Sequence, residues 1–459
     1  MREPAQKLIL MRVISAAPLF LFITNIILLI FQYKSNYLYN QAFCIRLAKR
    51  ATRLYLMNTD PLQLTVSLFR DVLPRPDLKF CIVIPVKNEA AGLMHTLDAL
   101  RCQQDAAGNA YPASTFEVLM LINNSIDNSY QIARSYQQQH PNFQLHIEQI
   151  NLPKPYANVG TARRLLMDAA HQRLSVMGRD NNIIASTDGD TIVDSQWLHY
   201  TQAAIEAGND AVGGRILTLA EVSDARQFHL RDVTYRCLLA KAEALIDPQE
   251  HDPLPRHFQF FGASMAVTCQ MYQRVGRLPR VPHLEDLAFY EALVAHDARV
   301  RKSFDVKVYT SARLEGRVAV GFSEQLTKWV ADQKLGKMQM VDSAAVLLAK
   351  YEVRKRLRNY WELKAVTAER CSELLVVAQL IGQPVQWLYQ QVCNAVYFGA
   401  LWAQIEPLLH QQVLLQHQSH QPVTEAIIVL RQFIAGFEPV PVFETDPTGT
   451  FLPVGRLSA

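Results

Sequence analysis

The sequence predicts an α/β protein whose doubly wound, mainly parallel sheet has helices on both faces. Short apolar runs alternate with amphipathic helical patterns between residues 79 and 190, which is typical of parallel strands joined by helices. Each apolar run is followed by a polar loop. Because the carboxyl ends of parallel strands meet at one edge of a sheet, these loops are expected to converge on one crevice.

The first predicted strand is stopped by Pro85, and the helix after it has Leu93, Leu97 and Leu100 at its inward positions. The second strand ends in a polar loop that caps the next helix. Strands are expected at residues 79–85, 116–122, 144–150 and 182–185, and helices at 93–100, about 130–139 and 165–170.

The turn Asp188-Gly189-Asp190 places two carboxylates one residue apart, directly after the fourth predicted strand. Mg²⁺ and Mn²⁺ prefer hard oxygen donors and are commonly held by one or two carboxylates together with substrate phosphates. Asp-Gly-Asp is also ordinary turn chemistry, so the turn alone leaves both interpretations open.

Considered in order along the chain, several motifs resemble those of the family 2 glycosyltransferases with a GT-A fold. The donor-side motifs are Ile84-Pro85-Val86-Lys87-Asn88-Glu89, Asn123-Asn124-Ser125-Ile126-Asp127-Asn128-Ser129, Gly160-Thr161-Ala162-Arg163 and Asp188-Gly189-Asp190, and the later ones are Phe260-Phe261-Gly262-Ala263-Ser264-Met265-Ala266 and His283-Leu284-Glu285-Asp286-Leu287. The resemblance covers roughly residues 80–326. It implies an inverting enzyme that moves a sugar from a nucleotide-diphosphate sugar to an acceptor hydroxyl.

The resemblance also implies which residues bind the donor. Pro85, Val86, Asn88 and Glu89 would line the nucleotide pocket, with Asn124 and Asp127 closing its other side and the Gly160 to Arg163 motif beside the diphosphate. The family usually has two aspartates where this chain has Asn123 and Asn124. Since an amide both donates and accepts hydrogen bonds, the base identity stays open.

Arg163 lies at a predicted helix start, where backbone N–H groups and the helix dipole favour phosphate, and a guanidinium would add charge-assisted bonds. Arg164 is an equal competitor for this role. The alternative is that Arg163 is a surface residue on a solvated first turn.

For catalysis, the resemblance implies that Asp286 is the general base and that Glu285 fixes the start of the helix. Asp188 and Asp190 would hold Mn²⁺ or Mg²⁺ against the diphosphate leaving group. The alternative is that Glu285 and Asp286 only place favourable charge on the first turn of a helix over residues 287–295.

Three further candidates are weaker. His283 is left outside the metal set, because a histidine just before a helix is more often a hydrogen-bonding residue. Arg313 and Arg317 are candidates for phosphate contact and could equally be surface charges.

Other functional classes find less support. A nucleotidyltransferase would need a Gly-rich loop after the first strand, which the Pro85 to Glu89 segment lacks. A binding module without turnover has no positive support while Asp188, Asp190 and Asp286 are all present. A net charge of +4 gives no reason to expect a nucleic-acid partner, and seven scattered cysteines favour reduced thiols and no zinc.

Residues 13–33 contain no charge and are long enough for a membrane helix, and the basic residues after them place the catalytic domain on the cytoplasmic side. Translation from Met57 is the alternative. The acceptor stays open, with a lipid-linked sugar or a polysaccharide as candidates. The expected divisions are a candidate anchor at 1–34, a helical linker at 35–78, the catalytic domain at 79–326, a helical region at 327–439 and an irregular tail at 440–459.

The helical region shows apolar residues at helical spacing, with a break at Gly382 and Pro384. The basic run Arg354-Lys355-Arg356-Leu357-Arg358 is interpreted as a solvated helix face, with an anionic membrane or acidic acceptor as the alternative. Helices are expected at 341–351, 352–368, 372–381, 385–402 and 423–437.

Overall fold

The computed structural model describes residues 68–154, 156–218, 226–310, 322–363, 368–416, 420–437, 443–445 and 451–453. The candidate membrane segment at 13–33, Met57, Arg313 and Arg317 lie outside these ranges. Among the described residues, every helix is too short or too polar to cross a membrane.

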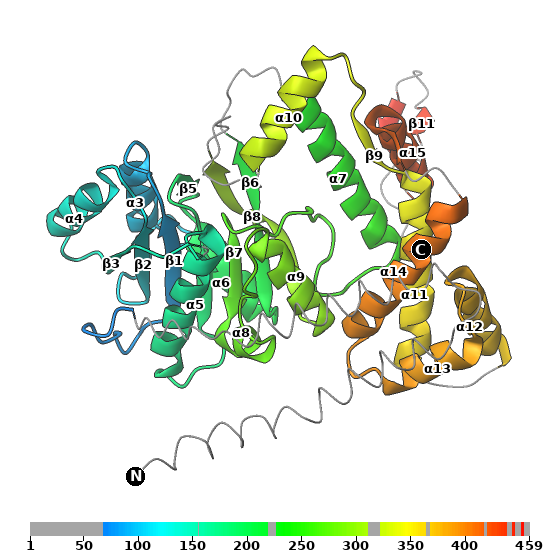
Figure 1. Cartoon of the computed structure of the whole chain (residues 1–459), viewed down its shortest axis with the longest axis horizontal. Helices are drawn as coiled ribbons and strands as arrows, with labels where there is room; N and C mark the ends of the chain where they lie inside the picture. Colours follow the sequence, from blue (N-terminus) through cyan, green and yellow to red (C-terminus); the bar gives the residue numbers. More distant parts are fainter. Residues whose placement is uncertain are drawn as a thin grey trace, which may run out of the picture. The chain divides into compact units, whose positions relative to one another are not determined.

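The chain forms a mixed α/β fold with an eight-stranded sheet, followed by a helical region (Figure 1). The sheet strands are β1 (Phe80–Val86), β2 (Phe116–Asn123), β3 (Leu145–Ile150), β4 (Ile183–Ser186), β5 (Thr191–Val193), β6 (Ala211–Thr218), β7 (Met265–Thr268) and β8 (Val300–Thr310). The helices between them are α3 (Leu93–Arg101), α4 (Ser129–Gln139), α5 (Val159–Ser175), α6 (Trp197–Glu206), α7 (Arg226–Ile246), α8 (Cys269–Arg274) and α9 (Glu285–Ala295).

The strand order is β3-β2-β1-β4-β7-β6-β8-β5. The β3, β2, β1 and β4 strands are parallel, as expected, but β7 runs antiparallel to both neighbours and β5 antiparallel to β8. The expectation of a mainly parallel sheet is therefore wrong for the second half of the sheet.

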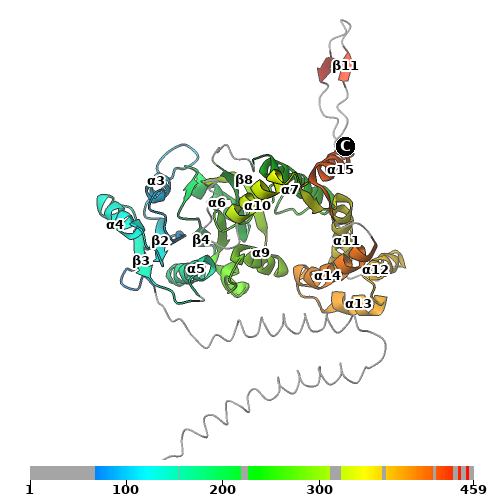
Figure 2. The ribbon, with the colours of Figure 1, turned by 45° about the horizontal axis from the view of Figure 1, so that its top comes forward.

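Both faces of the sheet are covered, which explains why β1 is apolar at every position. Phe80, Ile82 and Ile84 pack with residues of α3, α4 and α6, whereas Cys81 and Val83 pack with α5, α8 and α9. Figure 2 shows α3 and α5 on opposite sides of the sheet. The predicted inward leucines of α3 are fully buried. This packing fixes the carboxyl ends of β1, β2 and β4 at one edge.

The helical region contains α10 (Phe322–Lys334), α11 (Ala344–Leu363), α12 (Ala368–Leu380), α13 (Val385–Asn394), α14 (Phe398–Gln416) and α15 (Val423–Ala435), with the short strands β9 (Met340–Asp342) and β10 (His420–Pro422). The predicted break at Gly382 and Pro384 is confirmed between α12 and α13. Two other expectations are wrong. The residues around 351 form one continuous helix, α11, and the range 385–402 contains two helices instead of one.

Three smaller expectations also need correction. Residues 68–78, the described part of the expected helical linker, form turns. The expected irregular tail contains two paired antiparallel strands, β11 (Phe443–Thr445) and β12 (Phe451–Pro453). The basic run on α11 is a solvated face only in part: the Arg356 side chain is partly exposed, but Arg354 and Arg358 both donate to the carboxylate of Asp247, at 2.7 and 3.1 Å from their Nε atoms.

Candidate functional site

The loops after β1 and β2 are joined by hydrogen bonds between backbone and side chains. The Asn88 backbone donates to Ser125 Oγ at 3.0 Å, and Asn88 Oδ1 accepts from the Ile126 backbone at 2.8 Å. Asp127 Oδ2 accepts from the Ala90 backbone at 3.0 Å. Asn88 adopts a left-handed backbone with φ of 57°, which asparagine tolerates better than most residues. The structure thus brings together the predicted donor residues of both loops.

Asn124 is committed to a third loop. Its amide donates to the Leu152 carbonyl at 3.0 Å and accepts from the Leu152 N–H at 3.1 Å. An amide matches such a donor and acceptor pair, whereas an aspartate carboxylate would only accept. The asparagine at this position therefore ties the end of β2 to the segment after β3.

The 188–190 turn lies directly against the loop after β1. A Cβ placed on Gly189 would sit 3.0 Å from Glu89 Cγ and 3.1 Å from Val86 Cγ2, so little more than a glycine fits. Thr96 of α3 donates to the Gly189 carbonyl at 3.2 Å. The predicted metal ligands and the predicted donor residues Val86 and Glu89 are consequently neighbours.

Arg163 occupies the first turn of α5, where Asn158 caps the helix by accepting from the Thr161 N–H at 2.8 Å. The Arg163 side chain is only 3% exposed, so the alternative of a solvated surface arginine is wrong. Its guanidinium donates to Asp188 Oδ1 at 2.5 Å, to Ser186 Oγ at 3.2 Å and, in a short contact, to Glu285 Oε1.

Arg164 does not take part in this arrangement. Its Nε donates to Asp168 Oδ2 at 2.7 Å, and another of its nitrogens donates to the Leu278 carbonyl. Between the two neighbouring arginines, Arg163 is therefore the one that meets the 188–190 turn.

Asp286 lies on the first turn of α9 and is held by backbone groups. Its Oδ2 accepts from the Gly262 N–H at 3.0 Å, and its Oδ1 accepts from the Leu287 N–H at 2.8 Å. Leu284, just before the helix, has a left-handed backbone with φ of 56°, a strained conformation for leucine. In the first turn of α9, which follows Leu284, Glu285 is buried at 4% exposure and Asp286 is partly exposed.

Negative charge accumulates at this edge of the sheet. Burial raises the pKa of Asp188; the Arg163 charge lowers it, but the nearby carboxylates of Asp190 and Asp286 raise it again, and the net shift is upward. Arg163 bonds two carboxylates, those of Asp188 and Glu285, and those of Asp190 and Asp286 lie close enough to add to the negative charge. Such an excess of hard oxygen donors fits a divalent cation held by Asp188 and Asp190.

Within the described part of the chain, no group of three or more His, Cys, Asp or Glu side chains is arranged to hold a metal ion.

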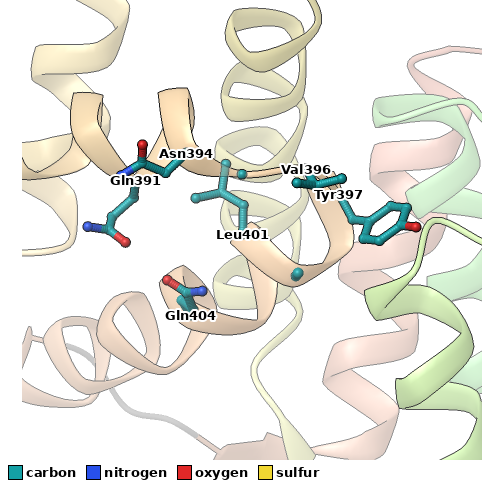
Figure 3. A pocket seen from close by; sticks show the side chains of 8 residues that line it. Gln391, Asn394, Val396, Tyr397, Leu401 and Gln404 are labelled. Atoms are coloured by element: carbon teal, nitrogen blue, oxygen red, sulfur yellow. The ribbon is translucent and has the colours of Figure 1, made fainter. Parts of the chain in front are cut away.

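Two small cavities, each of about 200 Å³, lie away from the predicted site residues. One is lined by residues of α13 and α14, including Gln391, Leu401 and Gln404 (Figure 3). The other includes Phe80 and Ile183. These two cavities contain none of the predicted site residues.

Sequence reasoning assigned no role to Ser186 or Gly262. Ser186 Oγ donates to the Gly262 carbonyl at 3.0 Å, while the N–H of Gly262 reaches Asp286. Both residues lie inside segments that the sequence marks, at the end of the fourth strand and in the Phe260 to Ala266 motif. Their contact depends on the β4 and β7 pairing, which runs antiparallel. The local sequence carries no signal of that pairing.

Comparison with known proteins finds sequence similarity to glycosyltransferases. Residues 81–266 match the profile of the family described as Glycosyl transferase family 2. A glycosyltransferase of Haloferax volcanii, AglE, is 30% identical over 136 residues, which are 29% of this chain and 38% of AglE. The chain thus matches well under half the length of this relative.

Solved structures give only a distant likeness. TarS of S. aureus in complex with UDP is 15% identical, covering 82% of this chain and 96% of TarS with a TM-score of 0.37. The mannosyltransferase PcManGT of Pyrobaculum calidifontis, in complex with GDP-Man and Mn²⁺, is 16% identical, covering 85% and 93% with a TM-score of 0.35. Scores this low assign no role to a residue. The similarity to glycosyl transferase family 2 is thus a sequence likeness over residues 81–266, which are less than half of the chain.

Proposed function

We propose that the protein transfers a sugar from a nucleotide-diphosphate sugar to an acceptor hydroxyl, with inversion at the anomeric carbon and on a GT-A type of fold. The observation that carries the proposal is the carboxylate cluster at the carboxyl edge of the sheet. There the 188–190 turn and Asp286 are close enough for Asp190 and Asp286 both to raise the pKa of Asp188.

The donor nucleotide would bind between the loops after β1 and β2. Val86, Asn88 and Glu89 would line one side and Asp127 the other. The two loops are joined by hydrogen bonds from Asn88 to Ser125 and Ile126 and from the Ala90 N–H to Asp127. Pro85 is the second-last residue of β1, Asn124 would close the far side with the part of its side chain not bonded to Leu152, and Gly160 stands at the start of α5. Since the two loops hold each other in place, donor binding would require little ordering of these loops, which lowers the entropic cost of binding.

Asp188 and Asp190 would hold Mn²⁺ or Mg²⁺. When bound, the ion supplies a Lewis acid for the charge that develops on the diphosphate leaving group. The backbone of the turn is held by Thr96, which donates to the Gly189 carbonyl.

Asp286 would take the proton of the acceptor hydroxyl. The N–H groups of Gly262 and Leu287 each bond one of its oxygens and so orient the carboxylate. A carboxylate oxygen has two lone-pair sites, so each oxygen keeps one for the hydroxyl proton. A base on the side of the sugar opposite the leaving diphosphate produces inversion.

The acceptor and the location of the enzyme are further parts of the proposal. We infer that residues 13–33 tether the protein to a membrane with the catalytic domain in the cytoplasm, since this uncharged stretch has the length of a membrane helix. A lipid-linked sugar or a polysaccharide would then be the acceptor. Full-length protein that stays in the supernatant after high-speed centrifugation without detergent would contradict the tether.

Donor turnover is the test of the proposed activity. The full chain, in detergent, is incubated with UDP-, GDP- and TDP-sugars and Mn²⁺, and release of the nucleoside diphosphate is measured. We expect hydrolysis of one donor class, loss of it with EDTA, and an inverted anomeric carbon by NMR. Asp286→Asn, which keeps the shape of the side chain, should lose turnover and still bind nucleotide. Retention of configuration, or normal turnover by Asp286→Asn, would contradict the mechanism.

A further inference from the structure

We propose that Arg163 is a positioning residue that joins the 188–190 turn to the start of α9, and that Gly262 is a glycine because this connection needs its space. The proposal deepens the proposed function and rests on it. The resemblance to the family implies a different role for Arg163, that of a direct contact to the donor diphosphate.

The environment of Arg163 argues against a phosphate contact. The side chain is 3% exposed, and its Nε, Nη1 and Nη2 atoms already donate to Ser186, Glu285 and Asp188. Glu285 is itself only 5% exposed at its side chain. Releasing the guanidinium to meet a phosphate would leave a buried carboxylate without its partner, which is strongly unfavourable.

The same contacts connect elements that lie far apart in the sequence. Arg163 and Glu285 are separated by 122 positions, and Arg163 and Asp188 by 25. One planar guanidinium therefore fixes the distance between the turn that carries the metal ligands and the helix that carries Asp286. The fork of an arginine can hold two carboxylates in a set geometry, whereas a lysine ammonium acts as a point charge.

Gly262 completes the connection. A Cβ on this residue would lie 2.5 Å from Cζ and from Nη2 of Arg163, so even an alanine would collide with the guanidinium. The Gly262 carbonyl accepts from Ser186 at 3.0 Å, and its N–H donates to Asp286 at 3.0 Å. Arg163 thus packs flat against the residue that orients the proposed base.

The first test separates positioning from phosphate binding. Arg163→Lys keeps the charge but loses the fork, so we expect kcat to fall about 100-fold, as misplacement by about 1 Å can cause. The Kd of UDP or GDP with Mn²⁺, measured by calorimetry, should stay within about threefold. A rise in that Kd of tenfold or more would overturn the proposal in favour of a phosphate contact.

A matched control is next in the sequence. Arg164→Lys alters an arginine on the same helix turn that bonds Asp168 and the Leu278 carbonyl instead. Its kcat should remain within about twofold of the wild type. An equal loss of kcat in both lysine variants would mean that any change in this helix turn has the same effect, and would overturn the specific role of Arg163.

The second test uses the glycine. Gly262→Ala should reproduce the kcat defect, because its methyl group displaces the guanidinium. Combining it with Arg163→Ala, which empties that space, should be no worse than Arg163→Ala alone. Multiplicative losses in the double variant would show that the two residues act independently and would overturn the connection.

A measurement without turnover distinguishes this proposal from the proposed function. Thermal unfolding of Arg163→Met, Glu285→Gln and the double variant forms a double-mutant cycle. We expect the double variant to lose clearly less Tm than the two single losses combined, since neither member of the Arg163 and Glu285 pair is left as a buried charge without the other. If the wild type hydrolyses no donor, the proposed function fails, and additive Tm losses would independently overturn the connection.

Discussion

Helix α5 carries a buried arginine near each end, and the two differ in how their charge is balanced. Arg173, in the last turn, meets Glu117 in a two-point pair with both distances at 2.7 Å. Arg163, in the first turn, meets Glu285 and Asp188, with Asp190 and Asp286 close enough to add to the negative charge. We call the Arg173 end of α5 the balanced end. The Arg163 end, where the carboxylates named here outnumber the guanidinium groups, is the unbalanced end.

The balanced end serves the fold. Arg173 also donates to the carbonyls of Phe69 and Val72, so the pair holds the segment before β1 against the sheet. Burial raises the pKa of Glu117, but hydrogen bonds from Arg173, His146 and Cys81 outweigh it and lower the pKa to about 2. The charge of Glu117 is thus compensated by protein groups alone, without a bound ligand. Burial of charge alone therefore does not mark a site.

The largest expected effect comes from removing a carboxylate at the unbalanced end. Asp190→Ala should lower kcat about 10³-fold, because several kcal/mol of stabilisation of the leaving diphosphate would be lost. The variant also removes repulsion from Asp188, which offsets stability lost with the contacts of the Asp190 carboxylate itself, so melting should change less than the rate. Rates and melting curves of the variant check both statements. Stability lost together with activity would mean that the cluster is as balanced as the Arg173 end.

The opposite result is expected at the balanced end. Glu117→Gln leaves Arg173 without its charge partner and should lower the free energy of unfolding by about 3 kcal/mol or more. The kcat of the folded fraction should be unchanged, because Glu117 lies at the second position of β2, away from the carboxyl edge. Urea unfolding and active-site titration test this. A selective loss of kcat would contradict the division between the two ends.

The sequence predicts much of this arrangement and misses the part that depends on distant packing. The strands β1 to β4 and the inward face of α3 follow from apolar periodicity, because burial on both faces demands it. The site motifs also meet at one edge, as parallel strands require. Neither the pairing of Arg163 with Glu285 nor the contact of Gly262 with Arg163 is visible locally, since each depends on how α5, β7 and α9 pack.

The helical region gives a second example. The structure ends α13 at Asn394 and begins α14 at Phe398. Residues 385–398 contain no glycine or proline, so the local sequence does not predict that a helix ends there. The break arises because Asp297, beyond the end of α9, accepts hydrogen bonds from the N–H groups of Phe398 and Gly399 at 2.7 and 2.6 Å. A helix cap supplied by a residue 101 positions away cannot be recognised from spacing. Tertiary contacts decide such boundaries.

A pH series gives a smaller effect that sharpens the comparison. The folded-state pKa of Glu117, about 2, lies below its ordinary value of 4.5, so its pair with Arg173 stabilises the protein fully above about pH 4.5. That stabilisation, about 3 kcal/mol for a shift of this size, is lost as the pH falls toward 2. Urea unfolding of the wild type and Glu117→Gln between pH 6 and 3 should show the gap in stability narrowing with acid. A difference in stability between the two proteins that does not change with pH would mean that ionisation of Glu117 is not the source of the stabilisation.

The smallest expected effect concerns the two contacts that hold α9: Arg163 bonds Glu285 at its start, and Asp297, just after its end, bonds the N–H groups of Phe398 and Gly399. Asp297 caps α14 from the end of α9, and removing such a cap costs about 1 kcal/mol. Asp297→Ala should therefore lower stability by about that amount and kcat by no more than a few fold. Asp297→Asn, which keeps an acceptor, should recover most of the loss, and Asp305→Ala, an exposed control, should show none. If Asp297→Ala lowered kcat as much as Arg163→Lys, the position of Asp286 would depend on the helical region as strongly as on the arginine at the unbalanced end of α5.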